Sequence, residues 1–237
     1  MMLPPVPEIR KELEAAADDS RAEILQRYFK TGPGEYAEGD LFLGVRVPEV
    51  RKVAQRYRGL ELDRVCALLR SPVHEERFLA LVILTKRYAK AGEGERRQLF
   101  DAYVGHLEFV NHWDLVDTSA MHVVGAHLYG RSRGLLFELA GSDRMWSRRV
   151  AIISTYYFIK RDDFGDTLRL AEVLLGDPHD LMHKAVGWML REVGKRDREA
   201  AEEFLRQFYG VMPRTMLRYA IERFPEGLRQ AYLKGRI

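Results

Sequence analysis

The stretch Lys184-Ala185-Val186-Gly187 lies in a segment of helical patterning, and three other stretches resemble it. They are Phe78-Leu79-Ala80-Leu81, Arg149-Val150-Ala151-Ile152 and Arg218-Tyr219-Ala220-Ile221. Arg149 precedes Lys184 by 35 residues, Arg218 follows it by 34, and Phe78 lies 71 residues before Arg149, close to two such steps. A period near 35 residues made of helix pairs is the signature of an α-solenoid, because single units cannot bury their own apolar face and must stack.

Helical patterning extends along the whole chain, and no stretch has the alternation typical of a strand. We therefore predict an all-α protein, a single domain over residues 1–237 with N-terminal helices and a loop in 1–40 and helix pairs in 41–237. Ser71-Pro72 and Asp177-Pro178 each place a capping residue before a proline, so we expect a long helix to begin at each. Residues 145–160 are predicted to form one long helix. Corresponding helices would line one concave side of the solenoid.

Composition limits the class of protein. The 237 residues are 46% hydrophobic and 31% charged, which fits a water-soluble domain with ample core. The single cysteine, Cys66, excludes an internal disulfide and a cysteine-cluster metal site. No apolar run approaches the roughly 18 residues of a membrane span, and the N-terminus lacks the pattern of a signal peptide. We expect a cytoplasmic protein without membrane contact.

Positive charge is concentrated in the second part of the chain. Residues 144–237 hold 18 Lys and Arg against 13 Asp and Glu, whereas residues 1–143 hold 20 against 22. Lys184, Arg191 and Lys195 fall on one side of a predicted helix, with Trp188 among them. A basic stripe interleaved with indole suits phosphates and bases, although ordinary solvated helix faces also carry such charges. A polyanionic partner is the interpretation we favour, because basic positions recur with the repeat.

Trp113 and Asp117 form a second constellation, in the stretch Asn111-His112-Trp113-Asp114-Leu115-Val116-Asp117-Thr118. Four residues apart on a helix, the indole and the carboxylate would project from the same face. Taken alone, most pairs of this kind are structural. The repeat places their helix in series with those that carry Arg149 and Trp188, so all four residues are predicted to face one groove.

No metal or cofactor site is evident in the sequence. His122 and His127 are five residues apart, about 140° around a helix, and cannot chelate together. His179 and His183 are four apart but have no evident third ligand. Neither a glycine-rich phosphate loop nor a serine elbow occurs. We expect no metal, no cofactor and no covalent nucleophile.

At this point the motifs resemble a known family, the AlkD-like DNA glycosylases, which are bacterial alkylation-repair enzymes built of HEAT-like helical repeats. The resemblance covers about residues 28–224, and four ordered segments carry it: Leu41-Phe42-Leu43-Gly44-Val45 followed by Pro48-Glu49, Trp113-Asp114-Leu115-Val116-Asp117, Trp146-Ser147-Arg148-Arg149, and Lys184 through Glu192.

The resemblance assigns roles to individual residues. The family's catalytic aspartate corresponds to Asp117, and its two cleft tryptophans correspond to Trp113 and Trp188. A cleft tyrosine corresponds to Tyr28 and an arginine near the lesion to Arg149. Residues expected to contact DNA are Tyr28, Arg46, Arg148, Arg149, Lys184, Arg191 and Lys195.

Two residues depart from the family pattern. His112 stands where the family often has a second aromatic residue before the tryptophan, and Arg46 stands where a polar, uncharged residue is expected. Both departures bear on strand contact or substrate range.

The resemblance implies base excision repair: hydrolysis of the N-glycosidic bond of N3- and N7-alkylated purines, such as 3-methyladenine and 7-methylguanine, in double-stranded DNA. No lysine amine accompanies Asp117, so we expect a monofunctional glycosylase without strand-cleaving chemistry. A solenoid with a DNA groove needs no partner subunit, so we expect a monomer, located in the cytoplasm and at the nucleoid when bound to DNA. Two alternatives remain at this point. The chain could be a non-catalytic DNA-binding relative, or a HEAT-repeat scaffold for other proteins, for which repeat architecture alone is sufficient.

Overall fold

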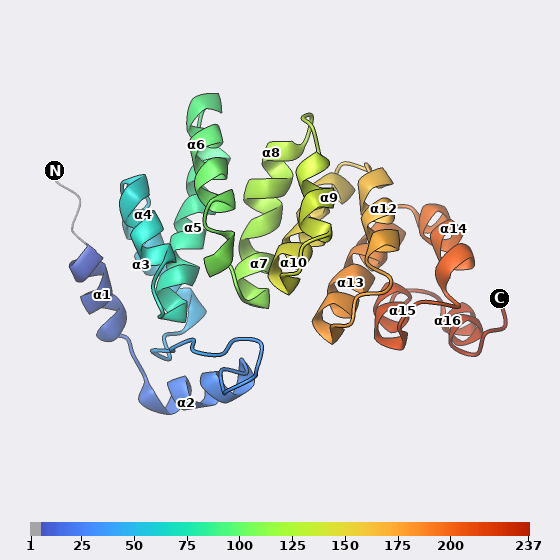
Figure 1. Ribbon diagram of the computed structural model, residues 1–237, viewed down its shortest axis with the longest axis horizontal. Coiled ribbons are helices and arrows are strands. Elements are labelled where there is room, and N and C mark those ends of the chain that lie inside the picture. The colour runs from blue at the N-terminus through green and yellow to red at the C-terminus, as the bar shows by residue number, and fades with distance from the viewer. Residues whose placement is uncertain (1–5) are drawn as a thin grey trace. The chain divides into compact units, whose positions relative to one another are not determined.

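A computed structural model describes residues 6–237, and within this range the chain is all α-helical, without a β-strand (Figure 1). The prediction of an all-α fold is thus confirmed. Two compact units make up the chain, one ending at Val123 and the other comprising Val124–Ile237. None of the described helices is long and apolar enough to cross a membrane.

In the first unit, α5 is the central helix and packs against α3, α4, α6 and α7. Its apolar side chains are fully enclosed, among them Leu79, Leu81 and Ile83. The helices of this unit are α1 (Val6–Glu14), α2 (Asp19–Tyr28), α3 (Val47–Arg56), α4 (Leu62–Leu69), α5 (His74–Lys90), α6 (Glu93–Val104) and α7 (Trp113–Ala120), with a 3-10 turn at Leu107–Phe109.

In the second unit, α13 has the central position and packs against α10, α12, α14 and α15. Gly187 makes the closest of these approaches feasible, because a Cβ there would lie 2.5 Å from the Met216 carbonyl oxygen of α15. The elements of this unit are α8 (Ala126–Leu128), α9 (Gly134–Ala140), α10 (Met145–Ser154), α11 (Tyr156–Ile159), α12 (Gly165–Val173), α13 (Asp180–Arg196), α14 (Arg198–Phe208), α15 (Arg214–Ala220) and α16 (Glu226–Leu233). A π-helical turn, Met121–Gly125, precedes α8.

The four similar stretches lie in α5, α10, α13 and at the end of α15, where Ile221 is the C-cap, so the sequence period does correspond to recurring helices. The arrangement of these helices as a solenoid stays a prediction, as does the grouping of all residues in one repeat domain.

Both predicted helix starts were wrong. The first residue of α5 is His74, with Val73 as its N-cap, and α13 begins at Asp180. Ser71 Oγ accepts a hydrogen bond from the Val73 amide at 3.1 Å, and Asp177 Oδ1 accepts one from the His179 amide at 2.9 Å. Each side chain therefore stabilises a turn just before the helix, which is the alternative use of such residues.

The single long helix predicted over residues 145–160 was also wrong, since it is interrupted at Thr155, between α10 and α11. Thr155 Oγ1 donates to the Ile152 carbonyl oxygen at 2.7 Å, and Ser154 Oγ donates to that of Val150 at 2.6 Å. Two consecutive hydroxyls that bond the preceding turn weaken the regular helical pattern there.

Candidate active site

Trp113 and Asp117 both belong to α7, one turn apart, and both side chains are half-buried. The indole of Trp113 stacks on Phe29, with ring centroids 5.4 Å apart and planes inclined by 24°. Tyr28, 63% exposed at the end of α2, meets the same indole edge-on at 6.4 Å. The structure thus brings together Tyr28 and Trp113, two of the residues that the resemblance assigned to a cleft, and their role in DNA binding stays a prediction. The result is a partly accessible aromatic surface one helical turn from a carboxylate.

A fully buried tyrosine lies close enough to Asp117 to sense its charge. Burial raises the pKa of Tyr103, and the Asp117 carboxylate raises it further, whereas a hydrogen bond with Ser119 lowers it. The Tyr103 hydroxyl is 2.9 Å from Ser119 Oγ, so a hydrogen bond joins α6 to α7 two residues after Asp117. This hydrogen bond holds α7, the helix that carries Asp117, against α6 within the first unit.

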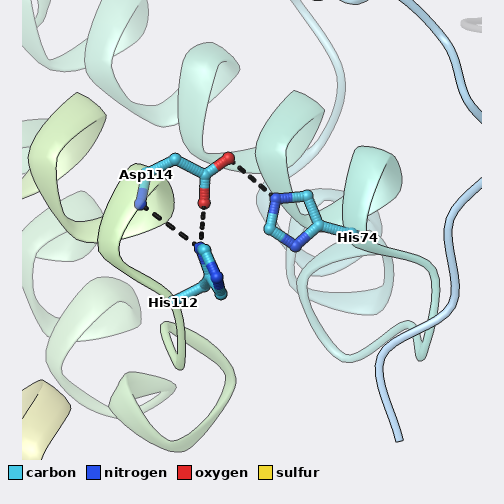
Figure 2. Close-up of side chains that lie close together, drawn as sticks. All are labelled: His74, His112 and Asp114. Atoms are coloured by element: carbon cyan, nitrogen blue, oxygen red, sulfur yellow. Dashed lines mark hydrogen bonds and ion pairs between the residues drawn. The ribbon is translucent and has the colours of Figure 1, made fainter. Parts of the chain in front are cut away.

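The other acid of the α7 motif, Asp114, lies between two imidazoles (Figure 2). Its Oδ2 is 2.8 Å from His74 Nε2 of α5, and its Oδ1 is 2.7 Å from His112 Nδ1. His112 is the N-cap of α7, and its Nδ1 also lies 3.5 Å from the Asp114 backbone nitrogen. Because a carboxylate only accepts, the shorter contact places the proton on His112 Nδ1.

Behind His74 lies a second carboxylate. His74 Nδ1 is 3.4 Å from Asp40 Oδ2, and Arg77 donates a short hydrogen bond to the same oxygen. Asn111 Nδ2 reaches Asp40 Oδ1 at 3.4 Å, and Arg77 also donates to the Ser71 carbonyl oxygen at 3.1 Å. Acidic and basic side chains thus alternate in one network, from Asp40 in the loop before α3, through His74 of α5, to Asp114 in the first turn of α7.

The pKa values of this network shift in opposite directions. Burial opposes ionisation of Asp114, yet the charge of His74 and the hydrogen bond from His112 hold the pKa of Asp114 well below its ordinary range. Burial likewise opposes protonation of His74, but Asp114 and Asp40 raise its pKa overall. Burial dominates at His112 and lowers its pKa. His74 is therefore favoured as the cation and His112 as the neutral ring.

His74, His112 and Asp114 are also the group, among residues 6–237, whose donor atoms lie close enough together to hold a metal ion, all within 4.8 Å. The donor types would suit zinc. However, His74 uses both of its ring nitrogens on carboxylates, and the separations of 2.7 and 2.8 Å are those of hydrogen bonds. The geometry describes a hydrogen-bonded network.

A cavity of about 340 Å³ opens beside this network. Its walls are mainly apolar, and Asp114 and His74 are among its lining residues. Arg21 and Arg46 also line the cavity, and Arg46 is exposed as the N-cap of α3. The apolar side chains around the cavity are Leu25, Phe29, Phe42, Val45, Val47, Pro48, Val50 and Phe78.

In the second unit, the accessible face of α13 carries the stripe that the sequence indicates. Lys184, Trp188, Arg191 and Lys195 are half-buried or exposed, while the helix positions between them are mostly buried. Trp188 Nε1 donates to Glu192 at 3.1 Å, and Lys195 Nζ donates to the same carboxylate at 2.7 Å. The side chains of Lys184 and Lys195 are 40% and 41% exposed. The ion pair of Lys184 with Asp180 is of the surface kind that contributes little to stability, whereas Glu192, the partner of Lys195, has only 10% of its side chain exposed.

The two arginines of α10 have different surroundings from the lysines. Arg148 Nε donates to Asp177 at 2.6 Å, and only 12% of its side chain is exposed. Arg149 is 5% exposed and donates to the Leu181 carbonyl oxygen at 2.6 Å. Both arginines therefore join the chain internally. Their DNA contacts stay a prediction, as does a groove shared by Trp113, Arg149 and Trp188.

Sequence reasoning missed the network behind α7. Asp40, His74 and Asp114 are separated by 34 and 40 residues along the chain, so no local spacing connects them. In the sequence, His112 was noted only because it replaces the aromatic residue of the family. In the structure it is 0% exposed and its ring bonds Asp114. This departure from the family pattern was the signal in the sequence that could have pointed to the network.

Comparison with known proteins agrees with the helical architecture. The family model of the DNA alkylation repair enzyme matches residues 9–224. The chain belongs to this family. A solved structure, "Predicted DNA alkylation repair enzyme from Enterococcus faecalis", superposes with a TM-score of 0.68 at 15% sequence identity, over 89% of this chain and 97% of that chain. At this identity the likeness shows a common fold. No curated protein matches the chain significantly.

Proposed function

We propose that this DNA alkylation repair family member is a monofunctional glycosylase that removes cationic N3- and N7-alkylated purines from duplex DNA. The observation that carries the proposal is the pairing, on α7, of a half-buried carboxylate with a half-exposed indole that stacks on Phe29. The recurring helices further support assignment of the repeats to the HEAT-like class.

The chemistry requires little beyond these groups. Alkylation at N3 or N7 makes the purine cationic and a good leaving group, and departure of the base leaves an oxocarbenium-like sugar. A carboxylate near the anomeric carbon stabilises that charge and orients the attacking water, as in glycoside hydrolysis. We assign this role to Asp117. The faces of Trp113 and Trp188 would hold the cationic base or sugar.

Strand cleavage is not expected. A lyase step requires an amine near the reacting carbon, and α7 contains no lysine. Tyr28 would contact the DNA beside Trp113, and Arg46, Lys184, Arg191 and Lys195, together with Arg148 and Arg149, would bind phosphates.

The test is release of 3-methyladenine and 7-methylguanine from methylated duplex DNA by wild type and Asp117→Asn. A charge pair at about 4 Å with an effective dielectric near 20 is worth about 4 kcal/mol. The variant should therefore lose about a thousandfold in kcat, with little change in DNA affinity. Asp101→Asn is the matched control, since Asp101 is an exposed acid in the same unit, paired with Arg97.

Equal release by wild type and Asp117→Asn would remove the catalytic role from Asp117. Salt-dependent duplex binding by a wild type that releases no base would instead identify a non-catalytic DNA-binding relative. No affinity for DNA at low salt would favour the scaffold.

A further inference from the structure

The first turn of α7 is held from inside the molecule by Asp114, whose carboxylate bonds His74 and His112. Asp114 follows Trp113 directly and precedes Asp117 by three residues. Figure 2 shows its carboxylate between the rings of His74 and His112, with one oxygen directed at each. Two hydrogen bonds to one carboxylate fix the direction of the turn as well as its position.

The network extends to a balanced set of charges. Protonated His74 and Arg77 face the carboxylates of Asp40 and Asp114, so two cations meet two anions in a largely buried space. The remaining acids of the first turn of α5 are engaged elsewhere: Glu75 accepts from the amides of residues 43–45, and Glu76 pairs with Arg10 of α1. Each charged group around His74 therefore has a defined partner within the protein.

The same network supports the back of the aromatic surface. The ring of Phe29 touches Trp113 on one side and His112 and His74 on others, at centroid distances of 5.4, 4.5 and 5.3 Å. If the first turn of α7 rotated, Trp113 would lose its stacking on Phe29. Asp117, one turn later on a helix of only eight residues, would move with it.

We propose that His74 and Asp114 are positioning residues, which lock the first turn of α7 so that Trp113 and Asp117 are presented in one fixed geometry. The part of this inference that concerns the reaction rests on the proposed glycosylase function. The part that concerns the geometry of Trp113 does not.

The first measurement follows Trp113 directly and needs no activity. Trp146→Phe together with Trp188→Phe leaves Trp113 as the sole tryptophan of the chain. In that background, Asp114→Asn and His74→Gln should each increase quenching of Trp113 by acrylamide and shift its emission maximum to the red. The matched control is His106→Gln, because His106 bonds Arg70 and the Ala102 carbonyl oxygen at the end of α6, outside the network. It should leave both readouts unchanged.

The second measurement separates positioning from binding in the otherwise native chain. A misplacement of catalytic groups by about 1 Å costs on the order of a hundredfold in rate. Asp114→Asn and His74→Gln should therefore lower kcat for base release about ten- to a hundredfold while KM for DNA changes little, the signature of an interaction that acts in the transition state. Circular dichroism of each variant verifies that the helices are retained.

The outcomes distinguish the two proposals. An inactive wild type in which both variants still loosen Trp113 would sink the glycosylase function and keep the positioning role. Folded variants with unchanged Trp113 quenching and unchanged kcat would overturn the positioning role alone. It would also be overturned if the purified wild type carried one zinc ion per chain that Asp114→Asn lost, because the two histidines would then be metal ligands.

Discussion

The two aspartates of α7, Asp114 and Asp117, are chemically identical but have different surroundings. Asp114 bonds two imidazoles, which stabilise it as an anion. Asp117 is half-buried on the same helix, one turn after Trp113, and its charge acts on the buried Tyr103. The two acids of this motif therefore differ in surroundings, and our proposals give them different roles: Asp114 positions the helix and Asp117 acts in catalysis.

The protonation of His74 should make the stability of the protein dependent on pH in a defined direction. Its folded-state pKa is raised above the ordinary value of 6.5, so its contribution is complete below pH 6.5 and is lost as pH rises through the raised value. Below pH 6.5, His74→Gln should lower the free energy of unfolding by about 3 kcal/mol, because the buried Asp114 carboxylate loses its cation while Asp40 keeps its pair with Arg77.

Urea denaturation between pH 5.5 and about 9 checks this expectation. The difference between wild type and His74→Gln should shrink steadily above pH 6.5. His106→Gln, whose ring nitrogen bonds the cation Arg70, should show no such convergence with wild type. A constant difference at every pH would mean that His74 acts through packing on Phe29 and Phe42 alone.

The sequence indicated the accessible residues of the candidate site but missed the buried residues that support them. Trp113, Asp117 and Tyr28 were predicted as site residues from a helical spacing and a family motif, and the structure shows Tyr28 in edge-on contact with the Trp113 indole. His74 and Asp40 gave no signal, because their relation to Asp114 exists only after the loop before α3 and the start of α5 have folded against α7.

The sequence predicted correctly that these segments are helical, but it placed some helix starts and one interruption wrongly. The errors share one physical cause, the competition of short polar side chains for backbone groups. Ser71 and Asp177 bond amides of the preceding turn, and Thr155 bonds a carbonyl inside a predicted helix. A sequence pattern does not decide which of these uses a hydroxyl or carboxylate will take, because both are locally favourable and packing selects between them.

The close approach of α13 to α15 within the second unit can be tested by a substitution at Gly187. Gly187→Ala introduces a Cβ 2.5 Å from the Met216 carbonyl oxygen and 2.6 Å from the Tyr219 Cβ, both of α15. Neither atom is a flexible side-chain end, so α13 and α15 must separate. We expect a loss of about 1–3 kcal/mol in the free energy of unfolding, measured by urea denaturation.

Gly94→Ala is the matched control for this change. Gly94 lies in α6 with open space around its Cβ position, and alanine there should stabilise the protein by about 0.5–1 kcal/mol through helix propensity. Equal effects of the two substitutions would show that the crossing of α13 and α15 tolerates an added methyl group. The repeat in the sequence predicted that these helices correspond, but not how closely they approach.

Over the whole molecule, a formal net charge of +3 conceals an excess of basic residues in residues 144–237. The structure ranks those residues by availability. Arg148 and Arg149 are occupied inside the second unit, whereas Lys184 and Lys195 extend from α13 with two-fifths of each side chain exposed. The exposed pair of Lys184 with Asp180 can be exchanged for a DNA phosphate at low cost, and Glu192 retains Arg191 and the Trp188 indole as partners when Lys195 turns to a phosphate. The accessible lysines, more than the arginines, should therefore determine the electrostatics of binding.

Salt dependence of duplex binding measures this contribution. Each phosphate neutralised on B-DNA contributes about −0.9 to the slope of log K against log salt concentration. Lys195→Gln should therefore make the slope shallower by about one unit, as should Lys184→Gln, without altering preference among sequences. Lys52→Gln is the control in the first unit, because Lys52 pairs with Glu49 three residues away at 2.8 Å, the spacing that Lys195 has to the less exposed Glu192. If Lys52→Gln changed the slope as much as Lys195→Gln, binding would depend on total charge, and the face of α13 would lose its special role. A change confined to the α13 lysines would show that this face meets the DNA backbone.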